Sequence, residues 1–308
     1  MSLFEKIACC AEPYDPDRRA YSRAVEFWEA AGSAPGALCA AAVEPAKTGL
    51  SAEEGSAPEW MPKGVDQESW LESWLEKDAP KAASRRVLRG EEPSRQLVAL
   101  EHEWGTTMLV LASGRDSGVE RFIPDFKLNM LRFSPAPAYI VHNSSPLSGH
   151  KGPVLIAMNV ATSDDRFMRD MHKFLMRRAR ELAGIFGVEV HIVNAVRPVS
   201  NPYPGDLVGL APEILGERLR RECFQNLLDF ASHYGIPDER CHVIDGIPEE
   251  VVPNLCQALE PSCLVMATSG RSGIAGSIIG NVPEAIMHRV DCDLLIVPSK
   301  CLKYQKMD

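Results

Sequence analysis

Short apolar runs alternate with longer segments of helical periodicity along the second half of the chain. Residues 154–158 are a continuous apolar run of the kind that forms a strand buried on both faces of a parallel sheet, and residues 188–195 and 264–267 are predicted to be further strands. Between the first two of these segments, apolar positions recur at helical spacing until Gly187, which ends this predicted helix. The same patterns predict further helices over 212–234, from Pro248 and over 282–289, and further strands over 241–244 and 294–297. Strict alternation of strand and helix predicts a parallel sheet with helices on both faces.

The first half follows the same order with weaker patterns. Residues 44–64 are rich in Ala, Pro, Gly, Ser and Glu, which is typical of a long loop. Around this loop the patterns predict strands over 5–10, 37–43, 86–89, 108–111 and 138–141, and helices over 18–31, 67–77, 94–104 and 126–133. Both halves therefore predict the same succession of elements.

The two halves also share sequence landmarks, which indicates an internal repeat. A shift of 156 positions places Ser113-Gly114-Arg115 on Ser269-Gly270-Arg271. Near the N-terminus a shift of 147 places residues 6–10 on residues 153–157. Self-similarity of this kind indicates two homologous units in one chain.

The polar residues 143–152, rich in Ser, Pro and Gly, separate the two copies. We therefore predict an α/β chain of two repeated doubly wound domains, residues 1–143 and residues 152–308. Each domain is expected to have a five-stranded parallel sheet with helices on both faces.

Residues 267–284 carry the chemistry that points to a ligand. A predicted strand ends there, a loop with several glycines follows, and a helix begins at Asn281. Backbone N–H groups at a helix N-terminus bind phosphate, and glycines let the main chain approach an anion closely. The stretch therefore indicates a phosphate-binding loop in the second copy.

This stretch resembles the nucleotide-binding loop of universal stress proteins, in which Gly, two residues, Gly, nine residues and Gly precede Ser or Thr. Here Ala267, Gly270, Gly280 and Asn281 stand at those positions. Residues 291–298 are similar to the family's last strand. With its two copies, the chain resembles the tandem, double-domain members of the family, which are the E type of bacteria.

The resemblance implies a Rossmann-like fold of the adenine nucleotide alpha hydrolase-like kind, and pairing of domains through their last strands. It also implies ATP or another nucleotide as the ligand of the second copy. The residues expected to bind it are Asn159, Ala267, Gly270, Gly280, Asn281 and Val282. The N–H groups of Asn281 and Val282 would face the phosphate, and Asn159 would lie at the ribose or base end.

Three of these residues depart from the family pattern. Members that bind ATP usually carry Asp where this chain has Asn159, the methyl group of Ala267 would crowd a close ligand, and Asn281 replaces Ser or Thr. Asn281 and Glu284 also have the spacing of a capping box, so a well-capped helix without a ligand is the alternative interpretation. We therefore expect modest affinity for ATP, or a different ligand.

The first copy lacks the residues of a nucleotide loop. Under the shift of 156, Pro124 takes the position of Gly280 and Asp125 that of Asn281. Proline has no N–H to donate, and an aspartate would repel a phosphate. We expect no nucleotide in residues 1–143, which should serve as a structural or regulatory partner of the second copy.

Charge and hydropathy narrow the class of partner. Among 308 residues, 33 Lys and Arg against 42 Asp and Glu give a net charge of −9, which argues against nucleic acid. No apolar run approaches the roughly 18–20 residues that span a bilayer, and residues 1–6 lack the features of a signal peptide. The nine cysteines include no CxxC pair, so we expect mostly buried thiols in a reducing compartment. We predict a cytoplasmic protein with no membrane partner.

Other candidate residues favour structural roles. The chain shows no spacing typical of a nucleophile with its base and no histidine pair at a metal-ligand interval, so we expect neither a catalytic nor a metal site. We expect His172 and Arg178 on the surface. All five tryptophans lie in the first copy; Trp70 and Trp74 share a helix face, and packing is favoured over a partner surface.

Taken with the resemblance, these patterns predict a binding and regulatory module of the stress response with nucleotide binding in the second copy. Two alternatives stay open, a carrier of a non-ATP small ligand in the second copy and a slow ATP hydrolase. Residues 138–141 and 294–297 are short apolar strands flanked by proline, which suits sheet edges that need cover. We expect them to pair with each other within one chain or with a second subunit in a homo-oligomer.

Overall fold

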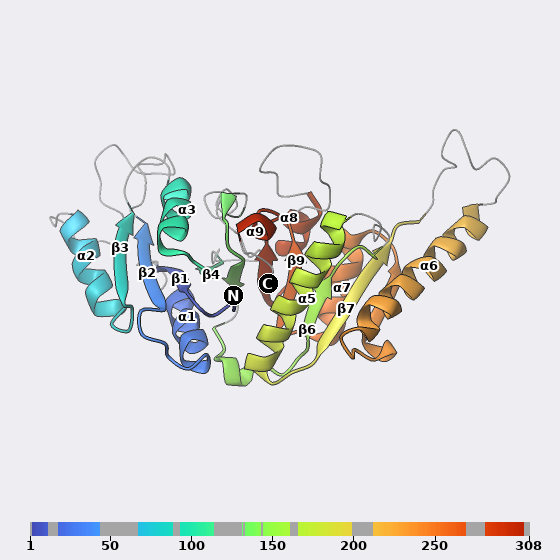
Figure 1. The fold of residues 1–308 in the computed structure, drawn as a ribbon, viewed down its shortest axis with the longest axis horizontal. Coiled ribbons are helices and arrows are strands. Elements are labelled where there is room, and N and C mark those ends of the chain that lie inside the picture. The colour runs from blue at the N-terminus through green and yellow to red at the C-terminus, as the bar shows by residue number, and fades with distance from the viewer. Residues whose placement is uncertain are drawn as a thin grey trace. The chain divides into compact units, whose positions relative to one another are not determined.

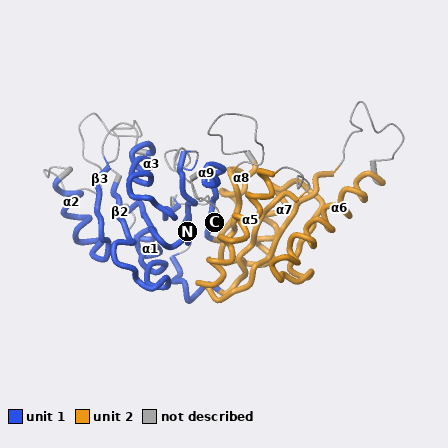
Figure 2. The backbone as a smooth tube through the Cα atoms, in the orientation of Figure 1, with its two compact units in different colours: residues 1–150, 293–308 blue, residues 151–292 orange. Residues whose placement is uncertain are grey.

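The computed structural model describes residues 2–11, 18–43, 67–88, 93–113, 131, 133–142, 144–160, 166–198, 212–268 and 281–304 (Figure 1). The chain divides into two compact units, unit 1 with Met1–His150 and Asp293–Asp308, and unit 2 with Lys151–Cys292 (Figure 2). The predicted loop 44–64, most of the predicted helix 126–133 and the glycine-rich segment 269–280 lie outside the described residues.

Unit 1 is built on a mostly parallel sheet. Its elements are β1 (Ile7–Ala11), α1 (Arg19–Ala30), β2 (Leu38–Val43), α2 (Gln67–Asp78), β3 (Ser84–Leu88), α3 (Pro93–Trp104), β4 (Met108–Ala112), β5 (Ala138–Val141), η1 (Leu147–Gly149), β10 (Asp293–Val297) and α9 (Cys301–Tyr304). The strand order is β3-β2-β1-β4-β5-β10, and every neighbouring pair is parallel except β5 with β10.

Unit 2 repeats this topology. Its elements are β6 (Val154–Ala157), α5 (Arg166–Phe186), β7 (Val190–Val196), α6 (Pro212–Ser232), η3 (Asp238–Arg240), β8 (Cys241–Asp245), α7 (Pro248–Leu259), β9 (Cys263–Ala267) and α8 (Asn281–Met287). The order β8-β7-β6-β9, parallel throughout, is that of β3-β2-β1-β4. The predicted α/β fold, a mostly parallel sheet flanked by helices, is confirmed (Figure 1). The expected five parallel strands in each domain are not found among the described residues, because β10 joins unit 1, which has six strands and leaves four in unit 2.

Burial follows the predicted hydrophobic pattern. Strands β1, β4 and β10 are buried along their whole length, as expected inside a parallel sheet, whereas β3 and β8 are partly exposed. The buried face of α5 includes Met171, Leu175 and Leu182, which recur at helical spacing. Gly187 follows this helix with φ +69°, in the left-handed region where glycine is favoured.

Strand β10 comes after unit 2 in the sequence but belongs to unit 1. It pairs antiparallel with β5, with Leu294 opposite Ile140 and Leu295 opposite Tyr139. Of the two pairings that we expected for the last strands, the structure shows the one within a single chain. Because of this ladder, unit 1 includes residues 293–308 and departs from the domain boundary drawn from the repeat.

The sheet register corrects one detail of the repeat alignment. Ile7 lies opposite Met108, and the shift of 156 carries Met108 onto Leu264, which lies opposite Leu155. Ile7 therefore corresponds to Leu155, a shift of 148 rather than 147. Side chains of a strand alternate between faces, so a difference of one position in the shift changes which residues of the two copies are equivalent. The counterpart of Asn159 is thus Ala11.

Some polar residues lie deeper than we predicted. The side chain of Arg178 is only 1% exposed. Its guanidinium lies 4.6 Å from the centre of the Phe174 ring and donates to Glu181 at 2.7 Å, so its charge is paired inside the helix–sheet layer rather than solvated. On α2, Leu71 and Leu75 are buried, while Trp70 and Trp74 are half-buried and stack at 6.4 Å.

Eight of the nine cysteines are buried, and Cys292 is half-buried.

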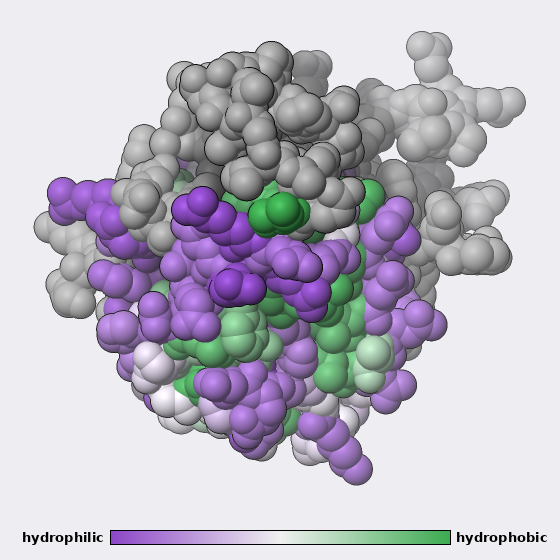
Figure 3. All heavy atoms as spheres, turned by 90° about the vertical axis from the view of Figure 1, so that its right-hand side faces the viewer, coloured by the Kyte–Doolittle hydropathy of each residue, from purple (hydrophilic) through white to green (hydrophobic). Residues whose placement is uncertain are grey.

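The outer surface carries isolated apolar residues. Among the described residues of unit 2, Ile214, Phe224 and Ile247 are the exposed large apolar side chains, and Figure 3 shows apolar surface interrupted by hydrophilic residues on one side of the molecule. Within the described part of the chain, none of the helices has the length and apolar character of a membrane span.

Candidate functional site

The strand order of unit 2 reverses at β6, which pairs in parallel with β7 on one side and β9 on the other. In open α/β sheets ligands bind at such a switch point, in the crevice outside the carboxyl ends of the strands. Ala157, the last residue of β6, lies opposite Met266. Asn159 and Ala267 therefore stand at the same end of neighbouring strands, as the sequence predicted.

The segment that follows β6 is held in place by two buried side chains. The N–H of Val160 donates to Oδ1 of Asn194 on β7 at 3.0 Å. His172 on α5 donates to the backbone carbonyl of Asn159. These contacts fix the backbone of residues 159 and 160, while the side chain of Asn159 is exposed. The structure thus presents an amide group at the end of β6.

His172 corrects the expectation of a surface residue. It is 4% exposed, and its ring packs against Phe230 at 6.0 Å. Burial lowers the pKa of His172 to about 4 although the hydrogen bond to the Asn159 carbonyl opposes this, so the ring is neutral at pH 7. The signal for burial was present in the sequence, since His172 lies beside Met171 and three residues before Leu175 on the buried face of α5.

The β9 side of the crevice is described in part. Ala267 is half-buried, and Thr268 after it is 5% exposed. Helix α8 begins at the predicted Asn281, and Val282 is half-buried. Gly270 and Gly280 lie outside the described residues. The structure therefore brings Asn159 and Ala267 to one end of the sheet and places the start of α8 where the sequence predicted it.

The corresponding place in unit 1 is filled by an arginine. Arg19, on the first turn of α1, is 5% exposed. Its Nη2 donates to the carbonyl oxygen of Ser113 at 2.7 Å and its Nη1 to the Ser113 hydroxyl at 3.4 Å. Ser113 directly follows β4, and Ala11 at the end of β1 is buried. A buried cation therefore lies at the strand end where the second copy begins its glycine loop. Pro124 and Asp125 lie outside the described residues.

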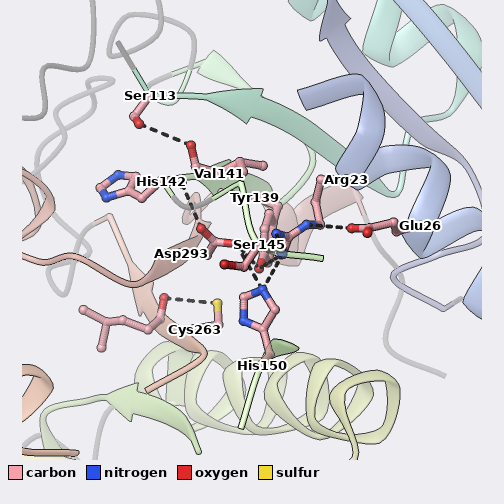
Figure 4. Close-up of polar contacts among 11 residues, drawn as sticks. Arg23, Glu26, Ser113, Tyr139, Val141, His142, Ser145, His150, Cys263 and Asp293 are labelled. Atoms are coloured by element: carbon pink, nitrogen blue, oxygen red, sulfur yellow. Dashed lines mark hydrogen bonds and ion pairs between the residues drawn. The ribbon is translucent and has the colours of Figure 1, made fainter. Parts of the chain in front are cut away.

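A second polar cluster of unit 1 surrounds Asp293 at the start of β10 (Figure 4). Its Oδ2 accepts from Nη1 of Arg23 and from the hydroxyl of Tyr139, each at 2.8 Å, and its Oδ1 accepts from the N–H of His142 at 2.8 Å. The side chain of Asp293 is fully buried, and that of Arg23 is 2% exposed.

Arg23 makes further contacts in the same cluster. It also pairs with Glu26 at 3.1 Å and donates to the carbonyl oxygen of Ser145 at 2.6 Å. These groups point toward one another in Figure 4. The Asp293 cluster therefore links the start of β10 to α1 and β5 through buried polar contacts.

The repeated order of strands and helices defines the class of doubly wound α/β proteins, and a polar residue is exposed at the switch point of unit 2. Residues 169–298 match the universal stress protein family. For this part of the chain, the match confirms the resemblance to universal stress proteins that was stated from the sequence.

Relatives with curated names agree with this resemblance. The chain is 30% identical over 172 residues to Universal stress protein E of Escherichia coli K12, which covers 55% of this chain and 53% of that protein. It is 27% identical over 180 residues to the Universal stress protein E homolog of Haemophilus influenzae. The aligned part of the chain thus spans about half the length of the curated relatives that it matches.

Solved structures support the fold over the whole chain. A putative universal stress protein from Pseudomonas aeruginosa has a TM-score of 0.72 and 19% identity, covering 98% of this chain and 96% of its own. A universal stress protein from Archaeoglobus fulgidus has a TM-score of 0.57 and 14% identity, covering 95% and 98%. At these identities the likeness shows the fold, and the function must be argued from the residues.

Proposed function

We propose that this chain is a tandem universal stress protein that acts in the stress response as a binding and regulatory module, and that unit 2 binds a nucleotide at the carboxyl ends of β6 and β9. The observation that carries the proposal is Asn159. Its backbone is fixed by His172 and Asn194, yet its side chain is exposed at the switch point. A polar group presented by rigid supports suits ligand binding.

The ligand chemistry follows from the residues assigned to the crevice. The amide of Asn159 can both donate to and accept from a ribose or base. Gly270 and Gly280 would allow close approach of the main chain, and the N–H groups of Asn281 and Val282 would face the phosphate. This set holds no positively charged side chain, so we expect modest affinity for ATP. The half-buried methyl group of Ala267 favours the alternative, a carrier of a different small ligand.

The proposal describes a binding protein rather than an enzyme, in which the last strand of the chain, β10, pairs with β5 within the same chain. We also propose that the protein is cytoplasmic, since its nine free and mostly buried thiols suit a reducing compartment. Native mass spectrometry of the purified protein tests the ligand directly. A co-purified nucleoside phosphate supports the proposal, and a different bound molecule supports the carrier.

A titration with ATP tests the position of the site. Gly280→Asp would introduce a side chain and a negative charge where the phosphate is expected, and should abolish binding. Gly184→Asp is the matched control. A Cβ at the exposed Gly184 meets nothing within 4 Å. Gly184 lies near the end of α5, the helix that leads back to the amino end of β7, away from the carboxyl ends of the strands. Isothermal titration should give one nucleotide per chain for the wild type and for Gly184→Asp. Equal binding by Gly280→Asp, or two nucleotides per chain, would show that the assignment is wrong.

A further inference from the structure

We propose that His191 on β7 and His242 on β8 form a binding site for a divalent transition-metal ion. Val193 lies opposite His242 in the parallel ladder, so His191, two residues earlier, is on the same face of the sheet. Nδ1 of His191 lies 3.1 Å from Nε2 of His242. The rings are nearly parallel, at 18°, with centroids 5.3 Å apart. Two imidazoles 51 residues apart in sequence thus meet on neighbouring strands.

The separation of the two nitrogens suits a shared metal ion. Metal–nitrogen bonds of about 2.0–2.1 Å place neighbouring ligands of one ion about 3.0 Å apart at right angles and about 3.4 Å apart in a tetrahedron. The 3.1 Å between His191 and His242 falls within this interval. Both rings would rotate so that their lone pairs, which lie along the hydrogen bond in this structure, turn toward one point.

The protonation state of the pair also fits metal binding. Burial lowers the pKa of both histidines, and His242 and the positive charge of Arg240 lower that of His191 further while Glu189 opposes this. These shifts favour the neutral imidazole, which is the form that binds metals. One ring donates a hydrogen bond to the other in the metal-free pair, and a tautomer shift frees the second nitrogen.

Glu189 is the nearest source of a third ligand. It lies two residues before His191 and pairs with Arg240, two residues before His242. The side chains are 58% and 30% exposed, so this ion pair is screened by solvent and contributes little. Glu189 can therefore exchange Arg240 for a metal ion. In the described part of the chain no three such groups already form a metal cluster, and water would fill the remaining positions.

The donor set selects the metal. Imidazole with one carboxylate suits Ni²⁺, Cu²⁺ and Zn²⁺, whereas Mg²⁺ and Ca²⁺ prefer oxygen ligands. Affinity should rise from Co²⁺ through Ni²⁺ to Cu²⁺. This site is distinct from the proposed nucleotide crevice, because His191 lies near the start of β7 and the crevice lies at the carboxyl ends of β6 and β9.

Calorimetric titration of untagged protein with Ni²⁺ tests the proposal. The background is Cys292→Ser, which removes the thiol that is not fully buried. We expect one Ni²⁺ per chain and a rise of Tm on binding, because the ion links two strands of the folded state. His242→Phe keeps an aromatic ring beside His191 and removes both nitrogens. It should weaken binding by about 10- to 100-fold or more and abolish the Tm shift.

Two further variants complete the test. His233→Asn, at an exposed histidine directly after α6, is the matched control and should bind Ni²⁺ like its parent. Glu189→Gln should weaken binding less than His242→Phe does. Far-UV circular dichroism confirms folding, and His242→Gln replaces His242→Phe if the latter does not fold. Unchanged affinity in the His242 variant, or a parent dissociation constant weaker than about 1 mM, would overturn the proposal.

Discussion

The carboxyl ends of the two parallel sheets share one strand order and differ in what stands there. In unit 1 the switch point between β1 and β4 is occupied by Arg19, whose guanidinium is bound to Ser113. In unit 2 the switch point between β6 and β9 presents the exposed amide of Asn159. The position equivalent to Asn159 in unit 1 is the buried Ala11. A repeat can therefore keep its topology while single side chains decide whether the strand ends are filled or accessible.

The buried ionisable groups extend this contrast. Unit 1 contains Glu101 on α3, whose burial raises its pKa to about 8. Unit 2 contains His172, whose burial lowers its pKa to about 4. The two units should therefore respond to pH in opposite directions, because each buries its group in the neutral form.

Glu101 should give the largest effect. Between pH 4.5 and about 8 the folded state keeps a proton that the unfolded chain loses, so the stability of unit 1 falls as pH rises through this window, by about 4–5 kcal/mol in total. Glu101→Gln should remove most of this dependence. Urea denaturation followed by tryptophan fluorescence measures it, since all five tryptophans lie in unit 1. The exposed Glu103→Gln is the control; if it removes the slope equally, Glu101 is not its source.

Asp293→Ala should follow in size. It removes the fully buried carboxylate partner of Arg23, whose guanidinium keeps only the ion pair with the partly exposed Glu26, and breaking a buried ion pair costs about 3–5 kcal/mol. The same fluorescence measurement detects the loss in unit 1. Asp291→Ala, at an exposed position two residues earlier, should cost far less. Equal losses in the two variants would contradict a structural role for the Asp293 cluster.

His172 should produce the opposite pH response in unit 2. Between pH 6.5 and about 4 the unfolded chain binds a proton that the folded state does not, so stability falls by about 3 kcal/mol as pH drops through this window. His172→Gln should reduce this pH dependence of stability. Part of it should remain, because the pKa values of His191 and His242 are also lowered. Hydrogen exchange of α5 and β7 measures it. A slope unchanged from wild type would show that His172 does not titrate as assigned.

Arg19→Ala should have the smallest effect on stability. It removes charge-assisted hydrogen bonds to Ser113, which contribute about 1.5–3 kcal/mol. It should not create a nucleotide site, because Ala11 offers no polar group. Titration with ATP should therefore still give the wild-type stoichiometry. A second bound nucleotide would mean that Arg19 alone keeps unit 1 empty.

Local sequence patterns were sufficient to predict the strands and helix ends such as Gly187. Burial of one face of an element gives a periodic pattern of apolar residues, and a helix end often needs a glycine. His172 and Arg178 were expected on the surface from their polarity alone, although both lie on the buried face of α5. The hydrogen bond from the N–H of Val160 to Asn194 joins residues 34 positions apart in the sequence, and no local pattern encodes such a pair. Strand register likewise depends on the partner strand, which explains the error of one residue in the repeat alignment.

The membership of β10 in unit 1 has a consequence for synthesis. Asp293 lies 154 residues after its partner Tyr139. At roughly 5–20 residues per second, a ribosome needs about 8–30 s to deliver it after the rest of the sheet. Throughout that interval Arg23 lacks the buried carboxylate of Asp293, and β5 lacks its antiparallel neighbour. Until β10 is synthesised, the sheet of the nascent first half is therefore incomplete, and the edge of β5 is exposed to other chains.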